Sequence, residues 1–125
     1  RHSVGRFGNY NCDSPWALVE SAAKAMKAKH GDNIEFVLWT GDGLSGTASG
    51  RSSERQVSAL KNLTHLLSQT FSGQFVFPVL GHDDPGWNPG ERLRYRDVAH
   101  FWSHWLPDEA IQTFNIGGYY TIELK

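Results

Sequence analysis

Cysteine is almost absent from this chain of 125 residues, which contains only Cys12. A single cysteine excludes a disulfide within the chain. No apolar run approaches the roughly 20 residues that a membrane-spanning helix needs, so we expect no transmembrane segment. The formal net charge is only -1, without the excess of basic residues typical of nucleic-acid binding, so we expect no nucleic-acid partner. Residues 1–6 lack the apolar stretch of a signal peptide, which suggests a chain already processed or cut from a longer one.

The pattern of apolar residues predicts an α/β fold, and we expect residues 1–125 to form one domain. Helical spacing of apolar side chains predicts helices at 14–30, with Ser14 as N-cap, and at 53–70, 91–106 and 107–117. Continuous apolar runs predict buried strands at 34–40 and 74–80, and residues 119–124 are predicted to form a last strand. A helix joins the first two strands, so they should be parallel. Because about three strands make a thin sheet, we expect further strands from another segment or another copy of the chain.

Two of the predicted strands end in acidic, glycine-containing tips. The first runs from Phe36 to Gly41-Asp42, and the second from Phe75 to Gly81-His82-Asp83-Asp84. The carboxyl ends of parallel strands are where α/β sheets place their ligand sites. Carboxylate and imidazole groups are common metal ligands, so these tips are candidates for a metal or phosphate site.

Five short motifs together resemble the acid sphingomyelinase-like phosphodiesterases, a branch of the calcineurin-like metallophosphoesterases. Their order and spacing are similar to that family over nearly all of residues 7–125. The most specific motifs are Cys12-Asp13-Ser14-Pro15-Trp16 and Trp39-Thr40-Gly41-Asp42. The others are Phe77-Pro78-Val79-Leu80-Gly81, Phe101-Trp102-Ser103-His104-Trp105-Leu106 and Gly117-Gly118-Tyr119-Tyr120.

The resemblance implies a partial metallophosphoesterase fold and two-zinc chemistry. Members of the family are secreted or lysosomal glycoproteins that hydrolyse phosphodiester or phosphoanhydride bonds, and two metals clamp the phosphate and activate a water molecule. By resemblance, Asp42 is the carboxylate shared by both metals. His82 stands where the family has a metal-binding Asn, and Asp84 is a further conceivable ligand. The resemblance also implies that Cys12 forms a disulfide with a segment outside this chain.

The sequence departs from the family pattern at several catalytic positions. The family's second tip reads Gly-Asn-His-Asp, with His as general acid, whereas this chain has Asp83 at the His position. A carboxyl group of ordinary pKa is ionised near pH 7 and is a poor proton donor there. The loop around Gly46 has no counterpart of the family's phosphate-contacting His, and the opening Asp-x-His motif has none either. We therefore expect zinc to be absent or incompletely bound.

Three other features have both a functional and an ordinary interpretation. Asn62-Leu63-Thr64 is an N-glycosylation sequon, and helical spacing turns Asn62 away from Leu60, towards solvent. His100 and His104 have a spacing that can bind a metal on a helix, but we expect solvent-facing or aromatic-packed histidines. Cys12 has no adjacent base in the sequence, so it is not expected to be a nucleophile.

Two hypotheses of function follow, together with a weaker third. The first is a secreted relative or fragment of the family that lacks hydrolytic activity as this chain alone. It would act through association, as a homo-oligomer or as a subunit of a larger assembly. The second is a piece of an active zinc-dependent phosphodiesterase, acting on sphingomyelin- or nucleotide-type phosphoesters and completed by other segments. The third is a lipid- or sugar-binding module that uses exposed aromatic residues.

Overall fold

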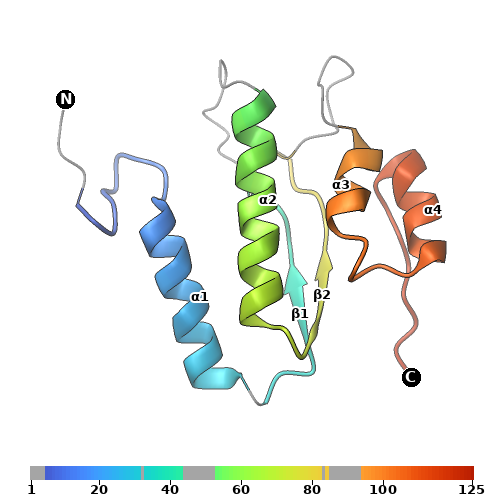
Figure 1. The fold of residues 1–125 in the computed structure, drawn as a ribbon, viewed down its shortest axis with the longest axis horizontal. Coiled ribbons are helices and arrows are strands. Elements are labelled where there is room, and N and C mark those ends of the chain that lie inside the picture. Colours follow the sequence, from blue (N-terminus) through green and yellow to red (C-terminus); the bar gives the residue numbers. More distant parts are fainter. Residues whose placement is uncertain (1–4, 32, 44–52, 83, 85–93) are drawn as a thin grey trace.

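Helices and strands alternate along the first half of the chain, and two short helices follow. The computed structural model describes residues 5–31, 33–43, 53–82, 84 and 94–125, without the side chains of residues 53 and 54. The elements, in order, are α1 (Trp16–His30), β1 (Phe36–Trp39), α2 (Ser53–Thr70), β2 (Phe75–Pro78), α3 (Tyr95–Phe101) and α4 (Asp108–Gly117). The carboxyl ends of both strands lie at the same end of the molecule as the amino ends of α1 and α2 (Figure 1). The α/β class predicted from the sequence is confirmed.

The predicted helices are present, with differences at their ends. The prediction of Ser14 as N-cap is wrong, because Pro15 occupies that position with the extended φ and ψ of -74° and 159°. The prediction of one helix to residue 106 is also wrong, because α3 ends at Phe101. The helix ends because Trp102 leaves the helical conformation, with φ -100° and ψ 7°. Further along, Pro107 disfavours the helical conformation of the preceding Leu106. Residues 91–93 lie outside the described part.

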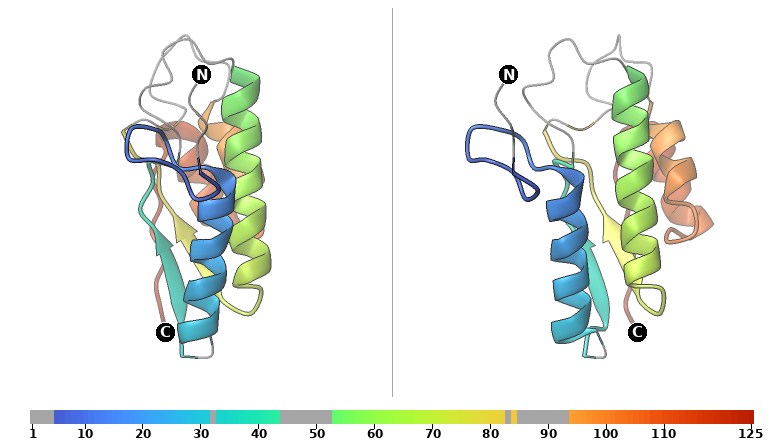
Figure 2. Two further views of the ribbon diagram at one scale, coloured as in Figure 1. Left: turned by 90° about the vertical axis from the view of Figure 1, so that its left-hand side faces the viewer. Right: turned by 60° about the vertical axis from the view of Figure 1, so that its left-hand side comes forward.

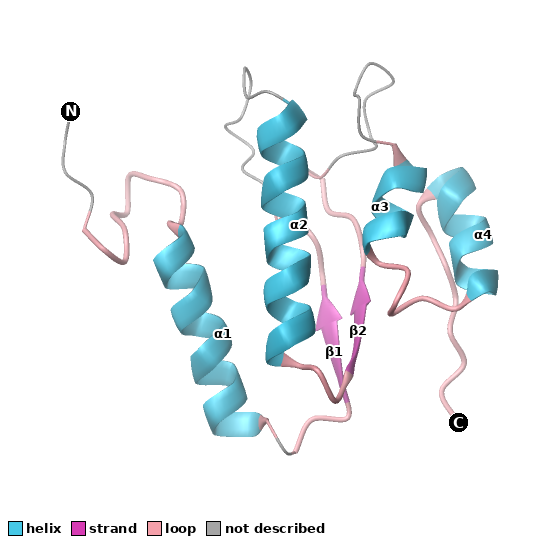
Figure 3. Ribbon diagram, in the orientation of Figure 1, coloured by secondary structure: helices cyan, strands magenta, loops and turns pink. Residues whose placement is uncertain are grey.

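The described sheet contains two parallel strands rather than about three. β1 and β2 pair in register from Phe36 opposite Phe75 to Trp39 opposite Pro78, so the predicted parallel pairing is confirmed. The prediction of a strand at 119–124 is wrong, because this segment is a loop that pairs with no strand of the described sheet (Figure 3). A side chain instead ties it to β2, since the hydroxyl of Tyr120 donates a hydrogen bond to the backbone carbonyl of Pro78 at 2.7 Å.

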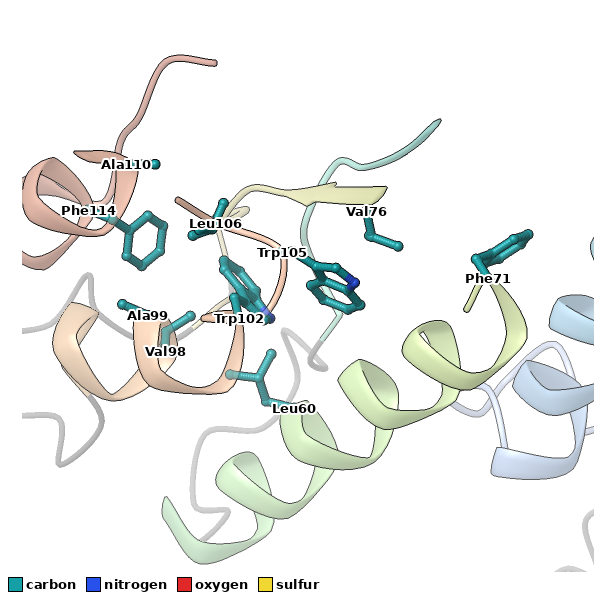
Figure 4. Packing of buried hydrophobic residues seen from close by; sticks show 10 residues of the cluster. All are labelled: Leu60, Phe71, Val76, Val98, Ala99, Trp102, Trp105, Leu106, Ala110 and Phe114. Atoms are coloured by element: carbon teal, nitrogen blue, oxygen red, sulfur yellow. The ribbon is translucent and has the colours of Figure 1, made fainter. Parts of the chain in front are cut away.

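One aromatic core joins α2, β2 and the two C-terminal helices. Trp102 lies between Leu60 of α2 and Phe114 of α4 (Figure 4), and its ring meets that of Phe114 edge-on at 5.5 Å. Each fully buried side chain of this size contributes about 1.5–3 kcal/mol to stability. The turned views show α2 running alongside both strands (Figure 2). This packing supports the inner face of the sheet.

The outer face of the sheet is apolar and largely exposed. Register places Phe36 beside Phe75 and Leu38 beside Phe77 on this face. Leu38 is 65% exposed and Phe75 is 61% exposed. Parallel strands are normally covered on both faces, so this sheet is covered on only one side within the described residues. None of the helices in the described ranges has the length and apolar character needed to cross a bilayer.

Candidate functional site

Two glycines allow the tips of β1 and β2 to touch. Gly41 has a φ of +90°, which is favourable only for glycine. A Cβ atom on Gly41 would collide with the backbone of Leu80 and Gly81, and one on Gly81 would collide with Asp42. The backbone therefore approaches more closely here than any residue with a side chain would allow. The contact follows from the parallel pairing of the strands, which places both tips at the same edge of the sheet.

Asp84 bonds the two tips together. Its Oδ2 atom accepts hydrogen bonds from the backbone N–H of Asp42 and from the backbone N–H of Gly81, both at 2.7 Å. The Asp84 residue is 4% exposed. Hydrogen bonds to an ionised carboxylate are short and stronger than neutral ones. One carboxylate oxygen thus connects two segments that are 42 residues apart in sequence.

Asp42 is the exposed acidic residue of the first tip. Its φ is +56°, and it is the only residue other than glycine with positive φ among those described. Aspartate tolerates this left-handed conformation better than most residues. Its side chain borders Gly81, so its carboxylate lies at the junction of the tips. This position is compatible with the predicted role of Asp42 as a metal ligand, which stays a prediction.

The described part of the second tip contains His82 and Asp84. His82 is exposed and follows Gly81 directly, so its predicted role as a ligand stays a prediction. Asp83, expected at the family's general-acid position, lies outside the described residues. The Oδ2 atom of Asp84 is already occupied by two N–H donors. The prediction that Asp84 binds a metal is likewise untested.

The fit of this region to a metal is partial. The Oδ1 atom of Asp84 is buried and has no hydrogen-bond partner in the described structure. A buried carboxylate oxygen of this kind is costly unless a donor or a cation compensates it, so the negative charge there favours a nearby cation. However, no group of three or more His, Cys, Asp or Glu side chains in the described residues could hold a metal ion. These residues alone do not form a two-zinc centre.

His100, His104 and Cys12 are not part of either strand tip. His100 and His104 are exposed, and the ring of His104 packs on Trp105 at 4.3 Å between centroids. Because α3 ends at Phe101, the two histidines do not share a helix. The expectation of solvent-facing, aromatic-packed histidines is confirmed. Cys12 is a free, exposed thiol, so its predicted disulfide with another segment stays a prediction.

The first residue of the sequon, Asn62, is exposed, whereas the last, Thr64, is buried. Asn62 is exposed on α2, which confirms its predicted orientation. Thr64 is only 5% exposed, and its hydroxyl accepts a hydrogen bond from the indole Nε1–H of Trp102 at 3.1 Å. Thr64 therefore has a structural role in the core whether or not Asn62 carries a glycan. No sequence pattern indicated this bond, because it joins side chains 38 residues apart.

The role of Asp84 was also missed by sequence reasoning. The spacing of Gly81 and Asp84 was a weak indication of this role. In turns, a side-chain oxygen of Asp can accept a hydrogen bond from the backbone N–H of a nearby residue. The bond from Gly81 to Asp84 has this spacing. The second bond, from Asp42, depends on the parallel pairing of the strands and could not be seen in the sequence.

Several curated proteins are similar to this chain, whereas no family model matches it. "Acid sphingomyelinase-like phosphodiesterase 3b" of Mus musculus is 35% identical over 127 residues, covering 98% of this chain and 28% of that protein. "Cyclic GMP-AMP phosphodiesterase SMPDL3A" of Homo sapiens is 34% identical, covering 94% and 27%. "Sphingomyelinase phosphodiesterase C" of Dictyostelium discoideum is 33% identical, covering 91% and 26%. The chain spans about a quarter of the length of these relatives.

Proposed function

Because this chain is homologous over nearly its whole length to the acid sphingomyelinase-like phosphodiesterases, we propose that it supplies part of a phosphodiesterase metal centre without being a hydrolase by itself. One observation carries the proposal. The tips of β1 and β2 are in contact, with Asp42 at their junction, yet the described residues contain no set of three metal-binding side chains.

The residues that would meet a metal are Asp42 and His82, one from each tip. A carboxylate oxygen and an imidazole nitrogen suit zinc. When bound, zinc would polarise a phosphate oxygen and activate a water molecule. The chain's own residues would contribute charge and position: Asp84 holds the tips together, and Asp42 presents an anionic ligand. Asp83 at the family's general-acid position supports a lack of activity in the chain alone.

A direct assay tests the lack of hydrolysis. The purified chain would be incubated with bis(p-nitrophenyl) phosphate and Zn²⁺ at pH 5 and pH 7, beside an Asp42→Ala variant and a zinc blank. We expect rates equal to the blank for both proteins. A zinc-dependent rate in the wild-type chain that is lost in Asp42→Ala would refute the proposal, because the side chains of this chain would then complete a catalytic site.

The second candidate function is that of an active phosphodiesterase in which other segments complete the site. It is favoured by the names of the relatives, which include a sphingomyelin phosphodiesterase and a cyclic GMP-AMP phosphodiesterase. The buried, unpartnered Oδ1 of Asp84 also favours it, since an added donor or cation would compensate that oxygen. Elemental analysis of the native assembly is expected to find zinc under this hypothesis, and its absence at any stoichiometry would refute it.

We further propose that the chain is secreted or lysosomal and associates with a second copy of itself. The outer sheet face supports association, since Phe36, Leu38 and Phe75 expose apolar surface with no charged side chain among them. Two such faces can pack together at the usual sheet-to-sheet spacing of about 10 Å without burying charge. Light scattering after size exclusion should give twice the mass of the chain, and Leu38→Asp should give the monomer.

Light scattering also distinguishes other forms of association. A monomeric wild-type chain would refute self-association. A complex of native material with a different protein would also refute it, in favour of a subunit in a larger assembly. Intact mass of native material, reduced and non-reduced, would reveal a disulfide partner on Cys12 and a glycan on Asn62. A mass equal to that of the bare chain under both conditions would contradict both modifications.

A further inference from the structure

We infer that Asp84 is a positioning residue, which fixes the backbone of Asp42 and thereby holds the Asp42 carboxylate at the junction of the two strand tips. The consequence for metal binding rests on the proposed function, in which Asp42 is a ligand. The positioning itself rests only on the geometry of the described residues. It gives Asp84 a role other than that of a direct ligand.

A single carboxylate oxygen of Asp84 accepts hydrogen bonds from both strand tips. Both N–H groups that reach the Oδ2 of Asp84 come from residues at the tips, and both lie at 2.7 Å. Asp84 is almost fully buried, so water does not compete effectively for these bonds. Because the same atom receives both bonds, a movement of either tip would lengthen at least one of them.

The backbone of the first tip has an unusual left-handed conformation. Asp42 has a φ of +56°, and the preceding Gly41 has a φ of +90°. The left-handed conformation is unfavourable for a residue with a side chain, and it persists where the surrounding structure restrains the backbone. The bond from the Asp42 N–H to Asp84 is part of that restraint. It fixes the direction in which the Asp42 side chain leaves the backbone.

The contact between Gly81 and Asp42 leaves no space for the Asp42 side chain to move towards the second tip. Gly81 borders both the backbone and the carboxylate of Asp42, with no room for even a methyl group. The Asp42 carboxylate is therefore confined by Gly81 on one side, while its backbone is bound to Asp84. A ligand on a restrained backbone loses less conformational entropy on binding a cation than one on a free loop.

Two variants of Asp84 and one control test the inference by NMR of the ¹⁵N-labelled chain. Asp84→Leu removes both acceptors, whereas Asp84→Asn keeps one neutral acceptor. Asp97→Asn is the matched control, because the Asp97 carboxylate also accepts a backbone N–H, that of Arg94 at 2.8 Å, and this bond involves neither strand tip. All four proteins would be compared by far-UV circular dichroism to verify that each is folded.

The expected signature is local to the amides of Asp42 and Gly81. In the wild type both should show slow hydrogen exchange and downfield proton shifts, as amides bonded to a carboxylate do. In Asp84→Leu both should move upfield and exchange at least tenfold faster, with a partial effect in Asp84→Asn. The control should leave both unchanged. If Asp84→Leu does not fold, the same comparison is made with Asp84→Asn.

Zinc titration of the same proteins provides the second readout. Loss of support for a metal ligand typically weakens metal binding tenfold to a hundredfold, and we expect this range for Asp84→Leu and no change for Asp97→Asn. Unchanged Asp42 and Gly81 amides in the Asp84 variants, or unchanged zinc affinity where the wild type binds zinc, would overturn the inference. If the wild type binds no zinc but its amides respond as expected, the proposed metal site fails while the positioning by Asp84 is upheld.

Discussion

The hydrogen bond between Trp102 and Thr64 gives a prediction whose size follows from the structure. The indole N–H of Trp102, a residue with 0% exposure, donates to the hydroxyl of the nearly buried Thr64. Thr64→Val keeps the shape of the side chain but removes the acceptor. A buried donor left without a partner costs about 1–3 kcal/mol. We therefore expect the free energy of unfolding to fall by that amount.

Urea unfolding followed by tryptophan fluorescence and circular dichroism measures this loss. With a slope of about 2 kcal/mol per molar urea, a loss of about 2 kcal/mol lowers the midpoint by about 1 M, at an unchanged slope. The midpoint, rather than the slope, should change because the substitution leaves the exposed surface of both states nearly the same. A changed slope would instead indicate altered compactness of one state.

A double-mutant cycle isolates the hydrogen bond from other effects of the substitution. Trp102→Phe removes the donor, so Thr64→Val in that background leaves no N–H unpaired and should cost at least about 1 kcal/mol less than in the wild type. The reasoning would be refuted if Thr64→Val cost the same in both backgrounds. A wild-type midpoint in the single Thr64→Val variant would also refute it.

Three further predictions concern the surface, the C-terminal segment and the strand tips. Because Asn62 is exposed, Asn62→Gln should abolish any glycan mass after secretory expression while changing the stability of the unglycosylated chain by less than about 0.5 kcal/mol; a larger loss would contradict its surface position. Burial raises the pKa of Tyr120 from 10.0 to about 12, so its contribution to stability is complete below pH 10 and is lost as pH rises towards 12. Tyr120→Phe should therefore make the free energy of unfolding fall less steeply between pH 10 and pH 12. The same dependence on pH in the wild type and the variant would disprove this prediction. Gly81→Ala should destabilise the chain by more than about 1 kcal/mol because the added methyl collides with Asp42, whereas Gly73→Ala, with open space around its Cβ position, should be nearly neutral; equal thermal midpoints for the two variants would contradict the close approach of the tips.

The sequence predicted most of the local structure because local structure depends on neighbouring residues. The period of apolar side chains located α1 and α2, and Gly117–Gly118 marked the end of α4, where Gly118 adopts a φ of +72°. The third strand was predicted incorrectly for a non-local reason. A strand forms only where a neighbouring strand offers backbone partners, and Tyr120 instead bonds to β2 through its side-chain hydroxyl.

By itself, the sequence determined the class of the fold, the parallel pairing of β1 with β2 and the relationship to the acid sphingomyelinase-like phosphodiesterases. These features depend on local patterns and on motifs that can be read in order along the chain. Only the tertiary structure decided what the acidic residues do at the tips. Asp84 turned out to be a buried acceptor for two backbone amides, and Asp42 an exposed carboxylate on a left-handed backbone. The physical reason is that burial and hydrogen bonding depend on contacts between segments far apart in sequence, and no local pattern specifies those contacts.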